Sequence, residues 1–306
     1  MPAVSINLCC YNSQAYLEET LASVFAQTCP DWELVVVNDG SSDRTDEIIR
    51  GHMARGRSIR YHAQKNAGLG VARNKALELS SGEFIAILDH DDVWEPQKLE
   101  KQLVLFKRPE VGFVGSDALL IDAQGRPLFL YSQRNALRRG RILRELFLYN
   151  FVPCAAAMMR KSAITKVGGF FRPDFSIAEE YELFLRLAES SEFDFVPEPL
   201  VRIRVHSASA SWNFAQEREE LRQTYEECLL RNPTLAKDLG PRTVAVKSTG
   251  LWLSPGMADA LNGQAPNVSM RFKAAALYNL ARYSPGTIDL LRHANRSLRR
   301  LKTALK

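Results

Sequence analysis

Short apolar runs alternate with amphipathic segments over residues 1–95 of the chain. Four of these runs have the length and β-branched content of strands, and the segments between them carry apolar residues at helical spacing. The predicted strands are Val4–Leu8, Leu34–Val37, Ile59–His62 and Phe84–Leu88, and the predicted helices cover Gln14–Gln27, the segment around Ile48, Ile49 and Met53, and Ala67–Leu79. Alternation of strands and helices indicates a mostly parallel sheet flanked by helices, so we expect an α/β fold.

The rest of the chain divides into a mixed part and a helical part. Residues 96–211 combine strand-like and helical patterns, whereas residues 212–306 are mostly helical in pattern and contain Pro255, Pro266 and Pro285. The predicted strands of the mixed part are Val111–Val114, Ala118–Ile121 and Leu128–Tyr131, and its predicted helices are Ile142–Tyr149 and Ala178–Ala188. We therefore expect one domain over residues 1–211, with halves 1–95 and 96–211, and a helical region over residues 212–306.

Composition and charge narrow the class of protein. Hydrophobic residues make up 46% of the chain and charged residues 25%, as in ordinary soluble proteins, and we expect neither a membrane-spanning helix nor a signal peptide. Five cysteines without C-x-x-C spacing predict no disulfide framework, so we expect a reduced, cytoplasmic protein. The net charge is +5, but residues 271–306 hold nine Lys and Arg against one acid, so the remainder is slightly acidic. We therefore expect no nucleic-acid partner.

Acidic residues follow two of the predicted strands. Asp39 lies in a turn after the second strand, and the run Asp89–Asp92 follows the fourth. Ligands of open parallel sheets bind beyond the carboxyl ends of the strands. Three carboxylates within four residues repel one another unless a cation lies among them, and Mg²⁺ prefers such oxygen ligands. The alternatives are a solvated turn that caps a following helix and, for Asp39, an ordinary turn.

Three further features carry possible chemistry. The run Gly68–Arg73 resembles part of a dinucleotide-binding fingerprint, but Arg73 replaces its third glycine and the expected downstream acid is missing, which excludes a Rossmann dehydrogenase. Glu179, Glu180 and Glu182 begin a predicted helix, where they either complement the helix dipole or supply a general base. His206 suits a metal, a diphosphate or a purely structural role.

Taken in chain order, these motifs resemble the family 2 glycosyltransferases with the GT-A fold. The resemblance covers residues 1–211. It is carried by eight segments, Ser5–Asn12, Ser23–Thr28, Val37–Asp43, Asn66–Asn74, Asp89–Asp92, Gly168–Phe170, Glu179–Leu183 and Arg204–His206. Two positions depart from the family pattern, because Glu180 stands where the family usually has aspartate and Asn38 where it often does.

The resemblance implies a metal-dependent, inverting transfer of a sugar from a nucleoside diphosphate sugar, of the UDP-sugar type, to a hydroxyl of a saccharide or lipid-linked acceptor in cell-surface polysaccharide synthesis. It makes residues 1–95 the nucleotide-binding half and residues 96–211 the acceptor-binding half. The implied base is Glu180, the metal ligands for Mn²⁺ or Mg²⁺ are Asp91 and His206, and Glu179 and Asp92 support them. The implied donor-nucleotide contacts are Asn12, Asp39, Gly68, Arg73 and Asp89, with Arg73 and His206 also directed at the diphosphate.

Two other functions and one location stay open at this point. A nucleotidyltransferase also places a nucleotide above a parallel sheet, and a catalytically weak homologue would only bind a nucleotide sugar. Ile288, Leu291, Leu298, Leu301 and Leu305 line one side of a possible basic helix. Such a helix predicts peripheral contact with anionic lipid on the inner face of the membrane, and the alternative is a solvated helix packed on the domain.

Overall fold

The computed structural model describes residues 2–206 and 214–250, together with positions 257, 261, 262, 273 and 277. The chain forms two compact units, the first made of Met1–Leu143 and Phe151–Ser209 and the second of Arg144–Asn150 and Ala210–Lys306. The predicted basic helix near the end of the chain lies outside the described residues. Within the described part, no helix combines the length and apolar character that a membrane-spanning segment needs.

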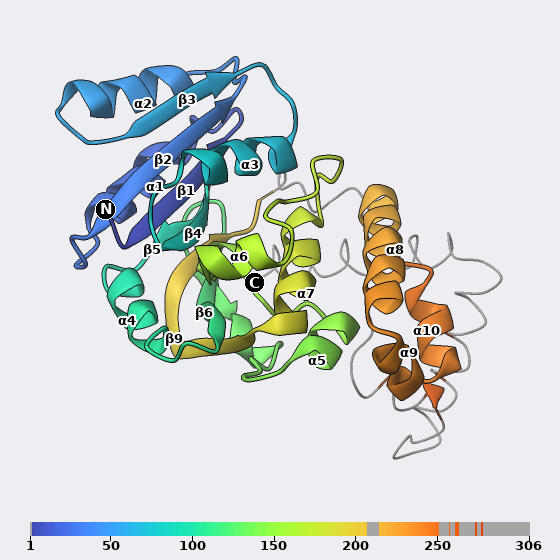
Figure 1. Ribbon diagram of the computed structural model, residues 1–306. Coiled ribbons are helices and arrows are strands. Elements are labelled where there is room, and N and C mark those ends of the chain that lie inside the picture. Colours follow the sequence, from blue (N-terminus) through green and yellow to red (C-terminus); the bar gives the residue numbers. More distant parts are fainter. Residues whose placement is uncertain are drawn as a thin grey trace. The chain divides into compact units, whose positions relative to one another are not determined.

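A mixed sheet forms the centre of the first unit (Figure 1). Its strands are β1 (Val4–Cys10), β2 (Trp32–Asp39), β3 (Arg60–Gln64), β4 (Phe84–Asp89), β5 (Val93–Trp94), β6 (Val111–Ile121), β7 (Pro127–Leu130), β8 (Met158–Arg160) and β9 (Glu192–Arg204). They are ordered β3-β2-β1-β4-β8-β6-β9-β5, with β7 paired to β6. The first four strands are parallel to one another, whereas β8 runs antiparallel to both β4 and β6. The predicted α/β architecture is confirmed.

The helices follow the predicted positions over residues 1–95. Helices of the first unit are α1 (Leu17–Phe25), α2 (Thr45–Ala54), α3 (Leu69–Leu79), α4 (Lys98–Leu105), α6 (Lys161–Lys166) and α7 (Glu179–Ser190), with short 3-10 turns η1 (Tyr131–Gln133) and η2 (Cys154–Ala156). The remaining helices are α5 (Leu143–Leu148), α8 (Phe214–Arg231), α9 (Pro233–Leu239) and α10 (Pro241–Lys247). The mostly helical pattern predicted after residue 212 is present wherever that region is described.

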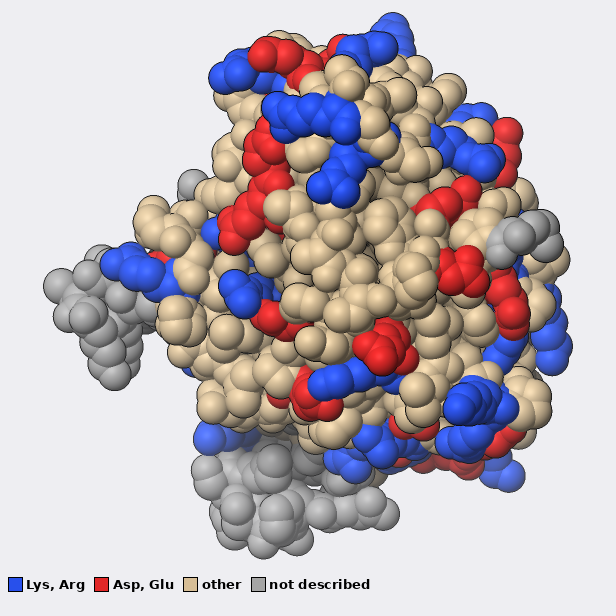
Figure 2. All heavy atoms as spheres, turned by 90° about the vertical axis from the view of Figure 1, so that its left-hand side faces the viewer, with Lys and Arg blue, Asp and Glu red and all other residues tan. Residues whose placement is uncertain are grey.

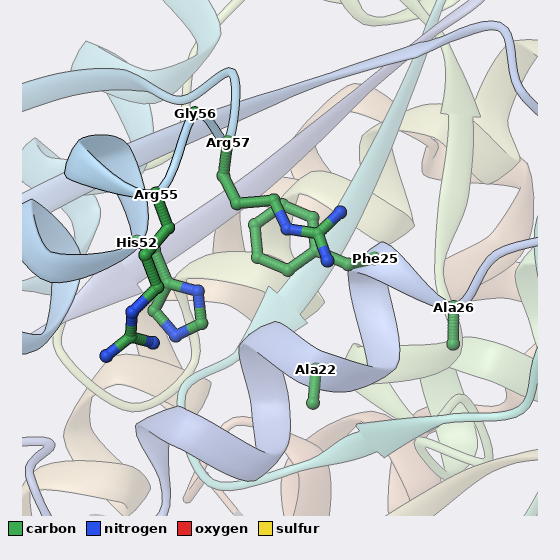
Figure 3. A pocket seen from close by; sticks show the side chains of 7 residues that line it. All are labelled: Ala22, Phe25, Ala26, His52, Arg55, Gly56 and Arg57. Carbon is green, nitrogen blue, oxygen red and sulfur yellow. The ribbon is translucent and has the colours of Figure 1, made fainter.

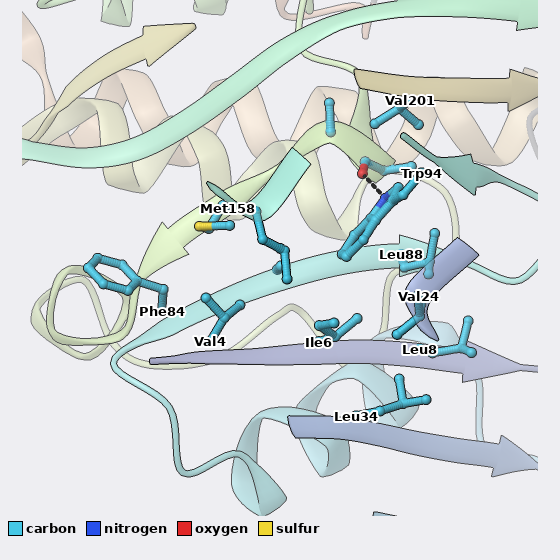
Figure 4. Close-up of a cluster of buried hydrophobic side chains, with 14 of the residues drawn as sticks. Val4, Ile6, Leu8, Val24, Leu34, Phe84, Leu88, Trp94, Met158 and Val201 are labelled. Carbon is cyan, nitrogen blue, oxygen red and sulfur yellow. Dashed lines mark hydrogen bonds between the residues drawn. The ribbon is translucent and has the colours of Figure 1, made fainter. Parts of the chain in front are cut away.

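The alternation of side chains along β1 separates two layers of core. One face carries Val4, Ile6, Leu8 and Cys10, which pack in a cluster with residues of α1, α2 and α4. Its opposite face contributes Cys9 to a second cluster formed with α3. In the first cluster the Trp94 indole N–H donates to the Ala155 carbonyl at 2.9 Å (Figure 4). This bond satisfies the one polar atom of a buried aromatic side chain and ties β5 to the segment that precedes β8.

Four strands of the sheet differ from the sequence prediction. The two strands predicted over Val111–Ile121 are one strand, because the buried Asp117 carboxylate accepts the N–H of Ala118 and the N–H of Ser132 at its bulge. Strand β9 was not predicted, since Pro197 and Pro199 argue against a strand. The register of β6 and β9 shifts between Ser116 and Ala118, opposite those prolines, so the ladder continues past them. Strands β5 and β8 and helices α4 and α6 were also missed.

The second unit has a small core of its own. The rings of Phe147 and Tyr225 meet edge to face with centroids 5.0 Å apart. The buried Lys247 ammonium lies 3.5 Å from the centroid of the Tyr225 ring and donates to the Leu148 carbonyl at 3.1 Å. Cation–π contact and a carbonyl partner together offset part of the cost of burying this charge.

Charge is mixed on the surface that Figure 2 shows. Acidic and basic side chains are interspersed over this face rather than gathered into one basic field. Basic residues at α2 are paired with acids of the same helix: Arg44, just before the helix, with Glu47, and Arg50 with Asp46. Pairs of this exposed kind contribute little to stability but keep the local net charge low.

Candidate active site

The two acidic segments predicted from the sequence lie on the same edge of the sheet. Strand β1 lies between β2 and β4 and is parallel to both. Cys10 pairs with Asn38 and Cys9 with Asp89, so the carboxyl ends of all three strands are level. Asp39 and Asp89 therefore begin the loops on either side of the loop that follows β1, which is the position expected of a ligand site in a parallel sheet.

Asp39 is buried and its carboxylate already has three partners. Its Oδ1 accepts the N–H of Ala67 at 3.0 Å and the amide of Gln64 at 2.8 Å, and its Oδ2 accepts the N–H of Gly68 at 2.9 Å. Gly68 has φ +95°, a conformation that favours glycine, and precedes the first residue of α3. Asp39 thus anchors the start of α3, and this bonding agrees with the turn interpretation, whatever contact it also makes with a nucleotide.

Asn12 joins the loops that follow β1 and β2. Its backbone adopts φ +50°, and its N–H donates to the Ser41 hydroxyl at 2.9 Å. Its side-chain oxygen accepts the N–H of Ser42 at 2.9 Å. The preceding residue, Tyr11, is 51% exposed. Asn12 therefore shapes the loop, and Tyr11 is the aromatic side chain that this loop leaves accessible beside the strand ends. No local sequence pattern separates Tyr11 from its neighbours.

The run Asp89–Asp92 does not cap a helix. It is followed directly by β5, and its carboxylates have three different surroundings. Asp89 pairs with Arg73, Asp91 with His206, and Asp92 accepts the N–H of Arg204 at 2.8 Å. Burial, together with the charges of Asp91 and Asp89, raises the pKa of Asp92 well above its usual value. Of these carboxylates, only those of Asp89 and Asp91 are partly exposed and available to a ligand.

Asp91 and His206 form the arrangement best suited to a divalent cation. Asp91 Oδ2 lies 2.8 Å from His206 Nε2, a separation that two ligand atoms of one metal ion also have. Among the described residues, no group of three or more Asp, Glu, His or Cys side chains gathers in metal-binding geometry. A site with two protein ligands suits Mg²⁺ or Mn²⁺ that is shared with substrate phosphates and water. The donor set therefore fits the expected metal.

Arg204 supports this pair and was not singled out from the sequence. Its guanidinium Nε donates to the Asp91 carbonyl at 3.0 Å, and its Nη2 lies 2.6 Å from a Glu19 carboxylate oxygen. The guanidinium also lies over the ring of Tyr16, whose other neighbour is the His206 imidazole at 5.2 Å. The motif Arg204–His206 was recognised, but no local pattern indicates which of its residues binds the Asp89–Asp92 loop through its guanidinium and which pairs with the Asp91 carboxylate.

Arg73 donates to protein carboxylates. A diphosphate contact was expected for it, and its side chain is 5% exposed. Nη1 reaches Glu179 at 2.6 Å and Glu180 at 3.3 Å, while Nη2 reaches Asp89 at 2.9 Å. Nη2 also lies 3.4 Å from the thiol sulfur of Cys154. These contacts bring the end of β4 and the start of α7 together.

The three glutamates at the start of α7 separate as their helical spacing requires. Glu182 turns to Arg186 on its own helix, with a closest approach of 2.7 Å. Glu179 is fully buried and has one carboxylate oxygen without a hydrogen-bond partner. Glu180 keeps 17% of its side chain exposed. Burial and the neighbouring Glu179 carboxylate raise the pKa of Glu180 well above its usual value. Glu180 is thus the most exposed of the three glutamates.

A surface depression between α1 and α2 is separate from these residues (Figure 3). It is lined by the last turns of both helices and by Arg55, Gly56 and Arg57. Helices α1 and α2 run back along the sheet, so their last turns lie at the edge opposite to Asp39 and Asp89. His52 is bonded to Glu18 at 2.8 Å and the Arg57 guanidinium lies over the Phe25 ring, so these groups are engaged with the protein itself.

Comparison with known proteins agrees with the fold and the order of the motifs. Residues 5–168 match the family model for glycosyl transferase family 2. A relative from Bacillus subtilis, named a putative teichuronic acid biosynthesis glycosyltransferase, TuaG, is 38% identical over 128 residues, which are 42% of this chain and 51% of the relative. The chain therefore matches about half the length of that relative.

Solved structures of glycosyltransferases share the fold. The Staphylococcus aureus TarS 1–349 complex with UDP-GlcNAc superposes with a TM-score of 0.63 at 16% identity, covering 91% of this chain and 81% of that one. A mannosyltransferase from Pyrobaculum calidifontis, in complex with GDP-mannose and Mn²⁺, superposes with a TM-score of 0.60 at 19% identity and covers 93% of this chain and 81% of its own. The fold of the chain is that of GT-A glycosyltransferases.

Proposed function

This chain belongs to glycosyl transferase family 2, and on that premise we propose that it transfers a sugar, with inversion and with a divalent metal, from a nucleoside diphosphate sugar to a hydroxyl of a saccharide or lipid-linked acceptor. Membership of the family excludes the nucleotidyltransferase alternative. One observation carries the proposal: the pair Asp91–His206 and the partly exposed Glu180 side chain belong to one site, in which Arg73 bonds both Glu180 and Asp89, two residues before Asp91.

Asp91 and His206 would hold the metal. Mn²⁺ or Mg²⁺ bound there would act as a Lewis acid that neutralises negative charge on the leaving diphosphate. Arg204 and Asp92 hold the loop so that the Asp91 carboxylate faces the imidazole. The mannosyltransferase from Pyrobaculum calidifontis was solved with Mn²⁺, which supports a divalent metal here.

Glu180 would be the general base. It would accept the proton of the acceptor hydroxyl as that oxygen attacks the anomeric carbon from the face opposite to the diphosphate. A carboxylate is able to do so only while it is ionised and within hydrogen-bond reach of the hydroxyl. Its partial exposure meets the second condition, and the nearby guanidinium of Arg73 favours the first.

The donor would be bound by the loops that follow β1, β2 and β4. Asp39, Asn12 and Gly68 shape the first two loops, and Asp89 presents a partly exposed carboxylate at the third. A UDP-sugar is the first candidate, supported by the UDP-GlcNAc complex of the fold relative from Staphylococcus aureus. A role in cell-surface polysaccharide synthesis is supported by the name of the Bacillus subtilis relative.

The cytoplasmic location and the contact with anionic lipid through residues 288–305 are proposals that depend on the sequence alone. A basic amphipathic helix there would hold the enzyme beside a lipid-linked acceptor. Equal sedimentation of the full chain with anionic and neutral vesicles at low salt would argue against it.

The experiment for the proposed function is release of nucleoside diphosphate from a panel of nucleotide sugars, with Mn²⁺ or Mg²⁺ and with simple saccharide acceptors. One donor should give metal-dependent, acceptor-stimulated release, and Glu180→Gln should lose that release while still binding the donor. Tight donor binding without turnover, equal for the wild type and for Glu180→Gln, would identify a binding protein instead.

A further inference from the structure

Arg73 connects parts of the candidate site that come from four elements. It extends from α3 and contacts Asp89 at the end of β4, Glu179 and Glu180 on α7, and Cys154 in η2. The ring of Phe171 lies 5.7 Å from its guanidinium carbon. Since the side chain is buried, these partners, rather than water, determine where the guanidinium lies.

Charge around Arg73 is not balanced. One cation faces the carboxylates of Asp89, Glu179 and Glu180 in surroundings that exclude most water. Without the cation, three neighbouring carboxylates of this kind cannot all stay ionised, because like charges and burial both favour the protonated form. Glu179 is the closest partner and is fully buried, so it serves as the fixed counter-ion, while Glu180 is the partner that remains accessible.

The shape of the guanidinium matters as well as its charge. One terminal nitrogen binds both glutamates of α7, and the other binds Asp89. A planar fork can hold two such groups in a fixed geometry, whereas a lysine ammonium is a single point charge on a flexible stem. The Arg73 side chain therefore connects Asp89, at the end of β4, with Glu180 on α7.

We propose that Arg73 is the positioning residue of the base: it favours the charged form of the Glu180 carboxylate and holds that carboxylate in a fixed relation to Asp89, rather than binding the donor diphosphate. This inference depends on the proposed function, in which Glu180 is the base. Among the described residues, the charged and titratable groups that face Glu180 are Arg73 from α3, Asp89 from β4, Glu179 from α7 and Cys154 from η2.

The test reads the ionisation of Glu180 directly. In protein labelled with ¹³C at the glutamate carboxyl, the Glu180 signal is identified by its loss in Glu180→Gln and is followed against pH in the wild type, Arg73→Met and Arg73→Lys. Removing a cation within 4 Å should move the Glu180 midpoint upward by about one pH unit or more. Arg73→Lys should raise the Glu180 midpoint less than Arg73→Met does, because lysine keeps the positive charge but lacks the planar guanidinium.

A matched control and two further measurements distinguish positioning of Glu180 by Arg73 from a contribution of Arg73 to the stability of the fold alone. Arg160, the last residue of β8, is a partly buried arginine whose guanidinium pairs with the Glu83 carboxylate at 2.6 Å. Arg160→Met should lower the melting temperature without moving the Glu180 midpoint. In Arg73→Met the pH midpoint of kcat should rise together with the carboxyl midpoint, and nucleoside diphosphate affinity should change less than kcat.

The outcomes distinguish the inference from the function on which it depends. An unmoved Glu180 midpoint in folded Arg73→Met, or in Arg73→Lys if the methionine variant does not fold, overturns the inference. If Arg73→Lys selectively loses affinity for the diphosphate and the Glu180 midpoint does not move, the result supports the diphosphate contact that the family resemblance implied for Arg73. If the midpoint shifts as expected but no donor of the panel is turned over, the inference about ionisation stands and the proposed function fails.

Discussion

Asp91 and His206 are 115 positions apart in the sequence, yet the carboxylate Oδ2 of one lies 2.8 Å from the imidazole Nε2 of the other. The contact arises because β4 and β9 both lead to this side of the sheet, and Arg204 bonds the Asp91 carbonyl two residues before His206. Each side chain is a good ligand for a divalent cation, and together they offer one oxygen and one nitrogen.

Replacing Asp91 tests this pair as a metal site. Asp91→Ala should abolish metal-dependent donor binding and transfer, because the cation loses a charged ligand in a poorly solvated cleft. Binding of Mn²⁺ in the presence of nucleoside diphosphate, followed by electron paramagnetic resonance, measures the loss apart from activity. Glu198→Gln, an exposed carboxylate paired with Lys101, is the control and should bind Mn²⁺ like the wild type. Full activity in excess EDTA would contradict the assignment.

Substitution of the glutamates of α7 tests the base. Glu180→Gln should keep the fold and donor affinity and lose transfer by roughly 10²–10⁴-fold, the usual contribution of general base catalysis. Glu180→Asp should retain part of the activity, because the carboxylate survives and only its reach is shorter. Glu182→Gln, which removes only a charge paired with Arg186 on the same helix, should transfer sugar at close to the normal rate. Loss in Glu179→Gln with normal transfer in Glu180→Gln would move the base by one residue.

The pH dependence of kcat follows from the raised pKa of Glu180. Because burial and Glu179 raise this pKa, the carboxyl is protonated and inactive as a base at low pH. The rate should therefore rise as the pH increases through the raised value, at a higher pH than for an exposed glutamate. Steady-state kcat across a series of buffers at constant ionic strength measures it. A rate that is already maximal near the ordinary glutamate pKa would show that another group limits the reaction.

Asp39 connects stability with nucleotide binding. Asp39→Ala removes the charged acceptor of the Ala67 and Gly68 N–H groups, and a hydrogen bond to a charged group typically contributes about 1.5–3 kcal/mol. We expect a lower melting temperature and weaker binding of the free nucleoside diphosphate, with a smaller effect on kcat at saturating donor. Thermal denaturation and calorimetric titration measure the two effects separately. Unchanged nucleotide affinity in the destabilised variant would leave Asp39 with its turn role alone.

Gly40 lies in the loop after β2, and Gly56, which follows α2, serves as its matched control. Both have positive φ, +76° and +81°, so an alanine is strained at either position by roughly 1–2 kcal/mol. At Gly40 a Cβ would also lie 2.5 Å from the backbone nitrogen of Asn66, whereas at Gly56 it would meet open space. Gly40→Ala should therefore reduce the free energy of unfolding clearly more than Gly56→Ala, and should also weaken donor binding. Equal losses in chemical denaturation would show that the loop moves to accommodate the methyl group.

Local patterns in the sequence were sufficient for the parallel part of the sheet. β1, β2 and β4 are apolar runs bounded by turn residues, and acidic residues follow two of them, so both the strands and the ligand edge could be predicted. The start of α7 and its three glutamates were predicted for the same reason, because the 3.6-residue period is a property of neighbouring positions. These features depend on residues a few positions apart.

Only the tertiary structure decided which side chains meet. β9 contains two prolines and is possible because its bulged register with β6 accommodates them, a pairing between segments about 80 residues apart that no local pattern encodes. Arg73 reaches Glu180 across 107 positions, and this contact changes its expected partner from a diphosphate to the carboxylates of the site. Such contacts arise when strands and helices distant in sequence are packed around one core. The residue types that a site can use are therefore written in the sequence, whereas the pairs that these residues form depend on the assembled fold.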